Sequence, residues 1–206
     1  MALLAAIRLR IRDDLDDAAS TLWTDAELDR FISHALRQLS HAIPRQQSTT
    51  IATTNGSRAV SITALTPRVR IVAVEYPTGT DPRTYVDFSS WIDTLTITSG
   101  PVPSGGNCIV YWHSQHTLDV STSTLSEEEE EILIAGAEGY ACRQQAAYAV
   151  NRISTGGPGV DRDWKTLSAD LLAEFWKGIR DRAKVGVRRL YIPSQPTPTQ
   201  DTDPGP

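Results

Sequence analysis

The sequence predicts an α+β protein: a four-helix bundle, made of two N-terminal and two C-terminal helices, with an inserted antiparallel β-rich domain and an extended C-terminal tail. Apolar residues recur at helical spacing near both ends of the chain, whereas the middle holds short Thr-, Val- and Ile-rich runs between turns. The last residues are polar and Pro-rich, which is typical of an extended segment. We expect residues 1–45 to form a helical hairpin, 46–120 the β domain, 121–190 the C-terminal helices and 191–206 the tail.

The first two helices are indicated by apolar stripes and a strong start signal. Leu4, Ile7, Ile11 and Leu15 recur at steps of three and four, which predicts an amphipathic helix. After the short link "ASTLW", Thr24 and Glu27 have the spacing of a capping box at the start of the second helix. Its polar face offers no reactive group. Because the link is short, we expect the two helices to form an antiparallel hairpin.

The middle of the chain predicts an antiparallel sheet, because its connections are too short for parallel crossovers. Asn55-Gly56 lies between two expected strands and favours a hairpin, since both residues tolerate positive φ. The strands are expected near Ser48–Thr53, Ala59–Ile62, Val69–Tyr76, Arg83–Phe88, Leu95–Thr98 and Cys108–Trp112.

Helical periodicity returns at "TLSEEEEEILIAGAEGYACRQQAAYAV", with Ser126 or Thr124 as the expected N-cap. The density of Ala and Gly in this segment predicts close approach by another helix. A fourth helix is predicted from Trp164 to about Val187.

Composition limits the classes of function. The 206-residue chain has 40% apolar and 22% charged residues, ordinary values for a globular protein. Its formal net charge of −5 argues against a general nucleic-acid binder. A membrane-spanning helix needs about 18 consecutive apolar residues, and no stretch of this sequence approaches that length. No secretion signal is recognisable. We therefore expect a soluble protein of a reducing compartment, with Cys108 and Cys142 as buried thiols.

No motif predicts catalysis, a cofactor or a metal site. His113 and His116 in "HSQH" lie on opposite faces of an extended chain, so they form a poor chelate and are interpreted as structural polar residues. "DDLDD" lacks the EF-hand spacing, "STGGPGV" lacks the Gly-Lys-Ser/Thr of a phosphate loop, and no Gly-x-Ser-x-Gly elbow occurs. Trp91, Trp112, Trp164 and Trp176 are interpreted as core or interface anchors.

Two charged segments remain as candidates for interaction. Glu127, Glu128, Glu129, Glu130 and Glu131 lie at a helix start, where the dipole favours anions, and could alternatively form an acidic patch at an interface or channel. Near the C-terminus, two cations and three apolar residues precede the Pro-rich tail. Either the cations interact with the dipole at the C-terminal end of the helix, or the segment anchors the chain to a partner protein. The apolar residues favour the second interpretation. This segment is Arg188, Arg189, Leu190, Tyr191, Ile192 and Pro193.

The order of these features resembles the head-to-tail adaptor proteins of tailed bacteriophages, also called head completion or connector proteins. The resemblance is carried by the helical hairpin with Trp23, Thr24, Asp25, Glu27 and Leu28, the β-rich insertion, "LSEEEEEILIAGAEGYACRQQA" and the long last helix. It covers the chain to about Arg189. The insertion is larger and more β-rich than in minimal helical adaptors.

The resemblance implies a structural protein without enzymatic activity or cofactor, forming a ring with itself, usually dodecameric, beneath the portal protein. The ring would extend the DNA channel and carry the next neck or tail protein. DNA would pass without sequence-specific binding, and no membrane would be involved. Arg188–Pro193 would reach the portal and Glu127–Glu131 would line the channel. The expected location is the virion's head–tail interface, and the host cytoplasm during assembly. The alternatives are a stopper or tail-completion protein, or a ligand-binding or hydrolytic domain.

Overall fold

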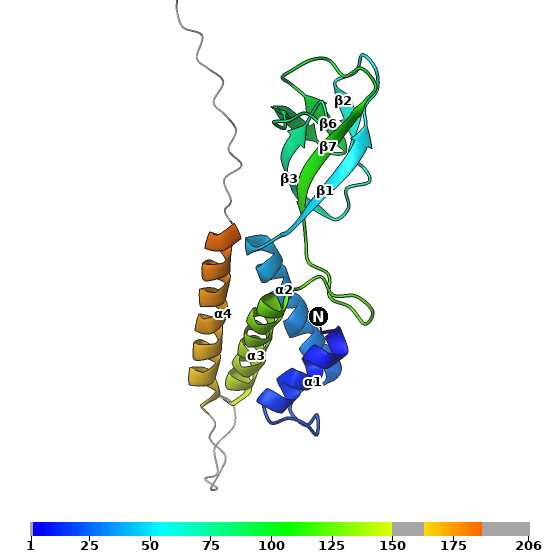
Figure 1. Ribbon diagram of the computed structural model, residues 1–206. Helices are drawn as coiled ribbons and strands as arrows, with labels where there is room; N and C mark the ends of the chain where they lie inside the picture. The colour runs from blue at the N-terminus through cyan, green and yellow to red at the C-terminus, as the bar shows by residue number, and fades with distance from the viewer. Residues whose placement is uncertain (1, 150–162, 187–206) are drawn as a thin grey trace, which may run out of the picture.

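The computed structural model describes residues 2–149 and 163–186, which form a helical body and a β body at opposite ends of the molecule (Figure 1). The chain enters the β body after α2 and leaves it before α3. The helices are α1 (Leu4–Asp14), α2 (Asp25–Ala42), α3 (Glu127–Ala149) and α4 (Trp164–Gly186). The strands are β1 (Arg45–Ala52), β2 (Ala59–Ser61), β3 (Arg68–Glu75), β4 (Tyr85–Val86), β5 (Phe88–Trp91), β6 (Thr94–Ile97) and β7 (Asn107–Ser114).

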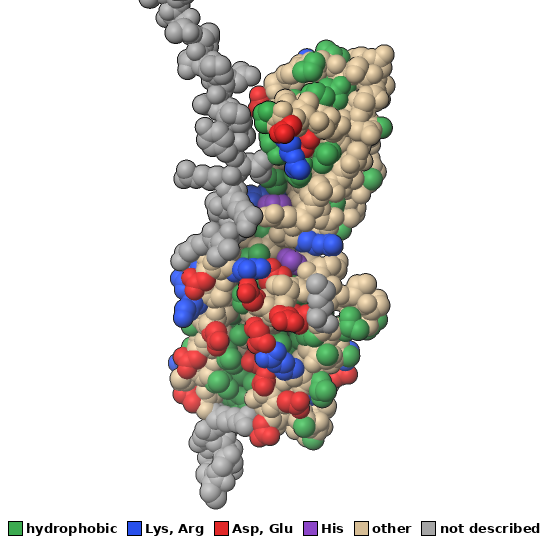
Figure 2. Space-filling model, viewed as in Figure 1, with side chains coloured by type: hydrophobic (Ala, Val, Ile, Leu, Met, Phe, Trp, Pro, Cys, Tyr) green, Lys and Arg blue, Asp and Glu red, His purple; other side chains and the backbone are tan. Residues whose placement is uncertain are grey.

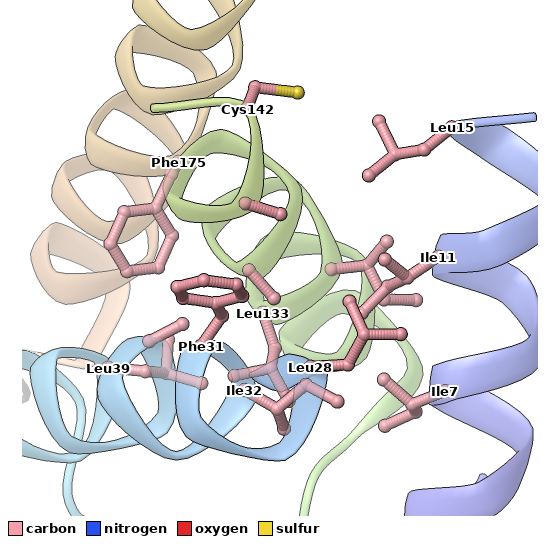
Figure 3. Packing of buried hydrophobic residues seen from close by; sticks show 14 of the residues in the cluster. Ile7, Ile11, Leu15, Leu28, Phe31, Ile32, Leu39, Leu133, Cys142 and Phe175 are labelled. Atoms are coloured by element: carbon pink, nitrogen blue, oxygen red, sulfur yellow. The ribbon is translucent and has the colours of Figure 1, made fainter. Parts of the chain in front are cut away.

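The helical body is organised around α3, which packs against both α2 and α4. Its core combines the apolar stripes of all four helices (Figure 3). Ile7 and Ile11 of α1 face Leu28 and Ile32 of α2, and Phe175 of α4 points in from the opposite side. The apolar periodicity in the sequence therefore identifies the buried face of each helix.

The link between α1 and α2 is held by a buried carboxylate. Asp17 accepts hydrogen bonds from the backbone N–H groups of Thr21, Leu22 and Trp23, and from Arg12 Nη1 at 3.0 Å. Burial disfavours the ionised carboxylate, but these donors outweigh that effect and hold the pKa of Asp17 below its usual value. The link thus has a specific geometry and leads directly into α2.

The start of α2 agrees with its sequence signal. Thr24 Oγ1 accepts a hydrogen bond from the Glu27 backbone N–H, and Glu27 Oε2 accepts one from the Thr24 backbone N–H at 2.9 Å. The predicted capping box is confirmed.

Helices α3 and α4 approach closely because glycine stands at their contact points. A Cβ atom added to Gly136 would lie 2.7 Å from the Phe175 ring, and one added to Gly139 would lie 2.8 Å from Leu172. On the facing helix, a Cβ at Gly178 would lie 2.8 Å from Ile132. The expected close approach of another helix to this Ala- and Gly-rich segment is confirmed.

The β body contains two antiparallel sheets around its own core. The first has the strand order β1-β7-β3-β4 and the second the order β2-β6-β5. The chain crosses between the two sheets four times, after β1, β2, β4 and β6. Both sheets contribute to a second apolar cluster that includes Val74, Leu95 and Trp112.

The fold class predicted from the sequence needs correction. The structure is α+β, with two N-terminal helices, two C-terminal helices and the β segment between them, but the β segment forms two sheets rather than one. The helices also do not close into a regular four-helix bundle. With 11 residues, α1 has less than half the length of α3 and α4, and it makes little contact with α4. The predicted tail lies outside the described residues.

The predicted Asn55-Gly56 hairpin is also wrong. Gly56 does adopt the positive φ expected of a turn, at +77°. However, six residues separate β1 from β2, whereas the tightest hairpins need two. All eight residues of β1 pair with β7, and β2 pairs with β6 in the other sheet.

Two expectations from composition can be compared directly with the structure. Cys108 and Cys142 are buried and form no disulfide with each other, as predicted. Across residues 2–149 and 163–186, no helix combines the length and apolar character that crossing a bilayer requires.

The α3–α4 contact predicts the effect of Gly136→Ala. Alanine favours a helix over glycine by about 1 kcal/mol, but its Cβ would overlap the buried Phe175 ring, and overpacking costs about 1–3 kcal/mol. We expect a net loss of about 1 kcal/mol in the free energy of unfolding, measured by urea denaturation. Gly106→Ala, where no atom lies within 4 Å of the added Cβ, is the control and should leave stability nearly unchanged. Equal stability of both variants would contradict the close contact.

Candidate functional site

The acidic run at the start of α3 is largely engaged within the molecule. Glu129 and Ser126 form a reciprocal pair, in which Glu129 Oε2 accepts from the Ser126 backbone N–H at 2.9 Å. Glu130 Oε1 accepts a hydrogen bond from the Ala2 backbone N–H at 2.6 Å. Ser126 is thus the cap, one of the two predicted alternatives.

The remaining carboxylates of the run lie at the surface. Glu131 accepts two 2.6 Å hydrogen bonds from Arg10, which hold its pKa below the usual value. Glu128 forms an ion pair with Arg182 at 2.9 Å. Glu127 is exposed. The five carboxylates therefore do not converge on one point, and four of them have partners within the molecule.

The candidate portal-binding residues, Arg188, Arg189, Leu190, Tyr191, Ile192 and Pro193, lie outside the described residues, as does the glycine-rich loop "STGGPGV".

The two histidines of "HSQH" have separate structural positions. His113 Nδ1 accepts a hydrogen bond from Arg70 Nε at 3.1 Å, and burial lowers the pKa of His113. His116 lies between the two bodies, with Nε2 2.9 Å from the Ile43 carbonyl oxygen and Nδ1 3.2 Å from that of Thr124. Its backbone N–H donates to Ser40 Oγ. His116 therefore ties the ends of α2 and β7 to the segment before α3.

The tryptophans divide between core and surface. Trp112 is buried in the β body, and Trp164 packs edge-on against Trp23. Trp91, at the turn between β5 and β6, is 81% exposed, and the adjacent Ile92 is 76% exposed with a φ of +52°. A β-branched residue rarely adopts this backbone conformation. The turn is held by Arg68, which donates to the Ile92 carbonyl oxygen at 2.7 Å.

A cavity of about 350 Å³ opens on the helical body between α1 and α4, with α3 as its floor; we call it the α1–α4 groove. It exists because α1 and α4 flank α3 without closing over it. The face that contains α3 carries many acidic side chains around apolar ones (Figure 2). The apolar residues of the groove are Ile132, Ile134, Ala135 and Leu171. Its carboxylates are Asp14, Glu131, Glu138, Glu174 and Asp181, and its cations are Arg10 and Lys177.

Glu138 is the unusual residue of this groove. It is only 6% exposed, and Oε1 has no hydrogen-bond donor among the described residues. Burial, followed by the charge of Asp14 and a hydrogen bond with Asp14, raises the pKa of Glu138 to about 8. A pKa of about 8 favours the protonated carboxyl group of Glu138 at neutral pH.

Glu138 was not predicted as a site residue from the sequence, although a local signal was present. Glu138 is the only charged residue between Ile132 and Cys142, and it stands among small residues on a helix that packs closely against another. Such a carboxyl must be buried or face a gap. Whether Glu138 is covered or lines a gap depends on where α1 ends. The residue pattern within α3 does not predict the end of α1.

The raised pKa predicts a specific pH dependence. In the unfolded chain Glu138 loses its proton near pH 4.5, but in the folded protein it keeps the proton to about pH 8. The folded state therefore holds more protons in this range, and its stability falls as pH rises. From pH 6 to pH 8, the free energy of unfolding of wild type should therefore fall by about 2 kcal/mol more than that of Glu138→Gln, as measured by urea denaturation.

Two controls accompany this measurement. The exposed Glu127→Gln should follow the wild-type pH profile in that range. His113 contributes the opposite slope below pH 6.5, because its pKa is lowered, so only the difference between variants is informative. Parallel profiles for wild type and Glu138→Gln would show that Glu138 ionises normally.

The position of His116 predicts a second stability effect. His116→Ala would leave the Ile43 and Thr124 carbonyl oxygens without the imidazole, and we expect a loss of about 1–3 kcal/mol in the free energy of unfolding. Limited proteolysis should then cleave the connection between the two bodies faster. His41→Ala, at an exposed position in the last turn of α2, is the matched control. Unchanged cleavage and stability in His116→Ala would show that the imidazole does not secure this junction.

No protein-family model matches this chain, and no curated protein sequence matches it.

Proposed function

We propose that this protein is a structural head-to-tail adaptor of a tailed bacteriophage, which assembles as a ring beneath the portal, extends the DNA channel and carries the next neck or tail protein. The observation that carries the proposal is the division of the chain into two bodies with separate cores, joined at α2–β1 and β7–α3. Such a subunit presents different surfaces to two neighbours.

The exposed apolar side chains support this division of roles. Trp91 and Ile92 project from the β body, whereas Leu9, Tyr148 and Trp176 are exposed on the helical body. Large exposed apolar side chains are favoured at protein interfaces. The β5–β6 turn is therefore a candidate contact with a neighbouring subunit or tail protein, and the helical body a candidate contact within the ring.

The distribution of charge is compatible with a DNA channel. The chain has a net charge of −5, and acidic side chains are prominent on the viewed face of the helical body (Figure 2). An acidic wall does not bind the phosphate backbone. Within Glu127–Glu131, the exposed Glu127 and the surface Glu128 and Glu131 are the members that could face DNA.

The proposal is tested by mixing the purified chain with the portal of the same phage and measuring particle mass by mass photometry and symmetry by negative-stain imaging. A cyclic complex of chain and portal is expected. A chain that stays monomeric in the presence of an intact portal ring would contradict the proposal. A tail-completion protein would bind the tail instead of the portal, and a hydrolase would turn over a substrate as a monomer.

A truncation tests the proposed portal anchor. Removing the residues after Arg189 should abolish the complex, while circular dichroism and thermal unfolding remain as in the full chain, because the truncated residues lie beyond α4. A truncated chain that still binds the portal would exclude the segment from Leu190 onward as the anchor.

A further inference from the structure

The α1–α4 groove has an excess of negative charge over an apolar floor. Five carboxylates and two cations line it, and Arg10 is engaged by Glu131 through two short hydrogen bonds. The carboxylates stand on three different helices: Asp14 on α1, Glu138 on α3, Glu174 and Asp181 on α4. The groove is therefore complementary to a cation that can contact more than one helix.

A buried carboxyl points to a missing partner. Glu138 is more than nine-tenths buried and lines the groove, yet its Oε1 lacks a hydrogen-bond donor among the described residues. A buried unpaired carboxylate is costly, and a hydrogen-bonded cation removes that cost. The unpartnered oxygen and the surplus of acidic groups are two separate observations that indicate the same kind of ligand.

The shape of the groove favours an organic cation over a metal ion. No set of three His, Cys, Asp or Glu side chains in residues 2–149 and 163–186 is arranged to hold a metal. The floor at Ile132, Ile134 and Leu171 is apolar, and it would accommodate the aliphatic stem of a long side chain. A guanidinium group is weakly hydrated and donates several hydrogen bonds in one plane, so it can reach carboxylates on different helices. The cavity volume, about 350 Å³, is at the small end for ligand sites and suits one side chain.

We propose that the α1–α4 groove binds an arginine side chain presented by a partner protein, with Glu138 and Asp14 as its central acceptors. The site belongs to the helical body alone, so the proposal stands or falls independently of the adaptor function.

Binding must release a proton. A guanidinium beside Glu138 favours the ionised carboxylate, so the Glu138 proton leaves for solvent and affinity rises with pH. The charged groups that face Glu138 are Arg10 and Asp14 from α1, Glu131 from α3, and Glu174, Lys177 and Asp181 from α4.

The probe is Nα-acetyl-arginine amide, titrated into the ¹⁵N-labelled full chain and followed by two-dimensional amide NMR. Nα-acetyl-citrulline amide is the matched control, since it has the same shape without the charge. We expect saturable shifts at the amides of Ala135, Glu138 and Gly178, and about tenfold tighter binding of the arginine probe than of citrulline at pH 8.5. This preference should shrink several-fold at pH 6.5.

Three variants separate a specific site from general attraction. Glu138→Gln should abolish both the preference for arginine and the pH dependence. Glu174→Gln, at an exposed position on the rim, should weaken binding without affecting the core, and it carries the test if the amide spectrum shows that Glu138→Gln is unfolded. Asp170→Asn, an exposed carboxylate of α4 outside the groove, should bind as wild type does.

Three results would overturn the proposal: no saturable shift at the groove amides, equal affinity for arginine and citrulline, or unchanged arginine binding in folded Glu138→Gln and in Glu174→Gln.

Discussion

The helical body depends on the close approach of α3 and α4 at Gly136, Gly139 and Gly178. Because these residues have no side chain, Phe175, Leu172 and Ile132 of the facing helices occupy the space, and the two long helices form one rigid unit. This unit fixes which face of α3 remains for α1 and α2. Since α1 is short, it covers only part of that face, and the α1–α4 groove is the part left open. One packing constraint therefore produces both the apolar core of the helical body and the α1–α4 groove.

The second constraint is the junction between the bodies. The helical and β bodies have separate apolar clusters, so their relative position depends on the two chain connections and on the hydrogen bonds around His116 and Ser40. A polar junction of this kind determines geometry through directional bonds rather than through buried apolar area. For a subunit proposed to sit between a portal and a tail protein, such a junction would hold two binding surfaces at a defined angle.

The acidic residues show how position changes the role of one chemical group. Ser126 and Glu129 form a local cap, Glu131 is paired with Arg10 more than a hundred residues away in the chain, and Glu138 is buried with its Oε1 unpartnered among the described residues. Only the first of these follows from sequence spacing. A run of carboxylates predicts a solvated helix start, but the position of Arg10 decides which of them is neutralised, and the end of α1 decides which is exposed to the groove.

The sequence alone determined features that depend on neighbouring residues: the capping box at Thr24, the apolar faces of the helices, the two buried thiols and the close helix contact at the Ala- and Gly-rich segment. These arise from backbone geometry and side-chain spacing within one element. Only the tertiary structure decided the pairing of β1 with β7, the division of the strands into two sheets, the incomplete closure of the helices and the position of Glu138. Each of these depends on which distant elements bury apolar surface against one another. Asn55-Gly56 illustrates the difference, because Gly56 adopts the positive φ that a turn favours, yet β1 pairs along its whole length with the distant β7 and not with the short β2 that follows the turn.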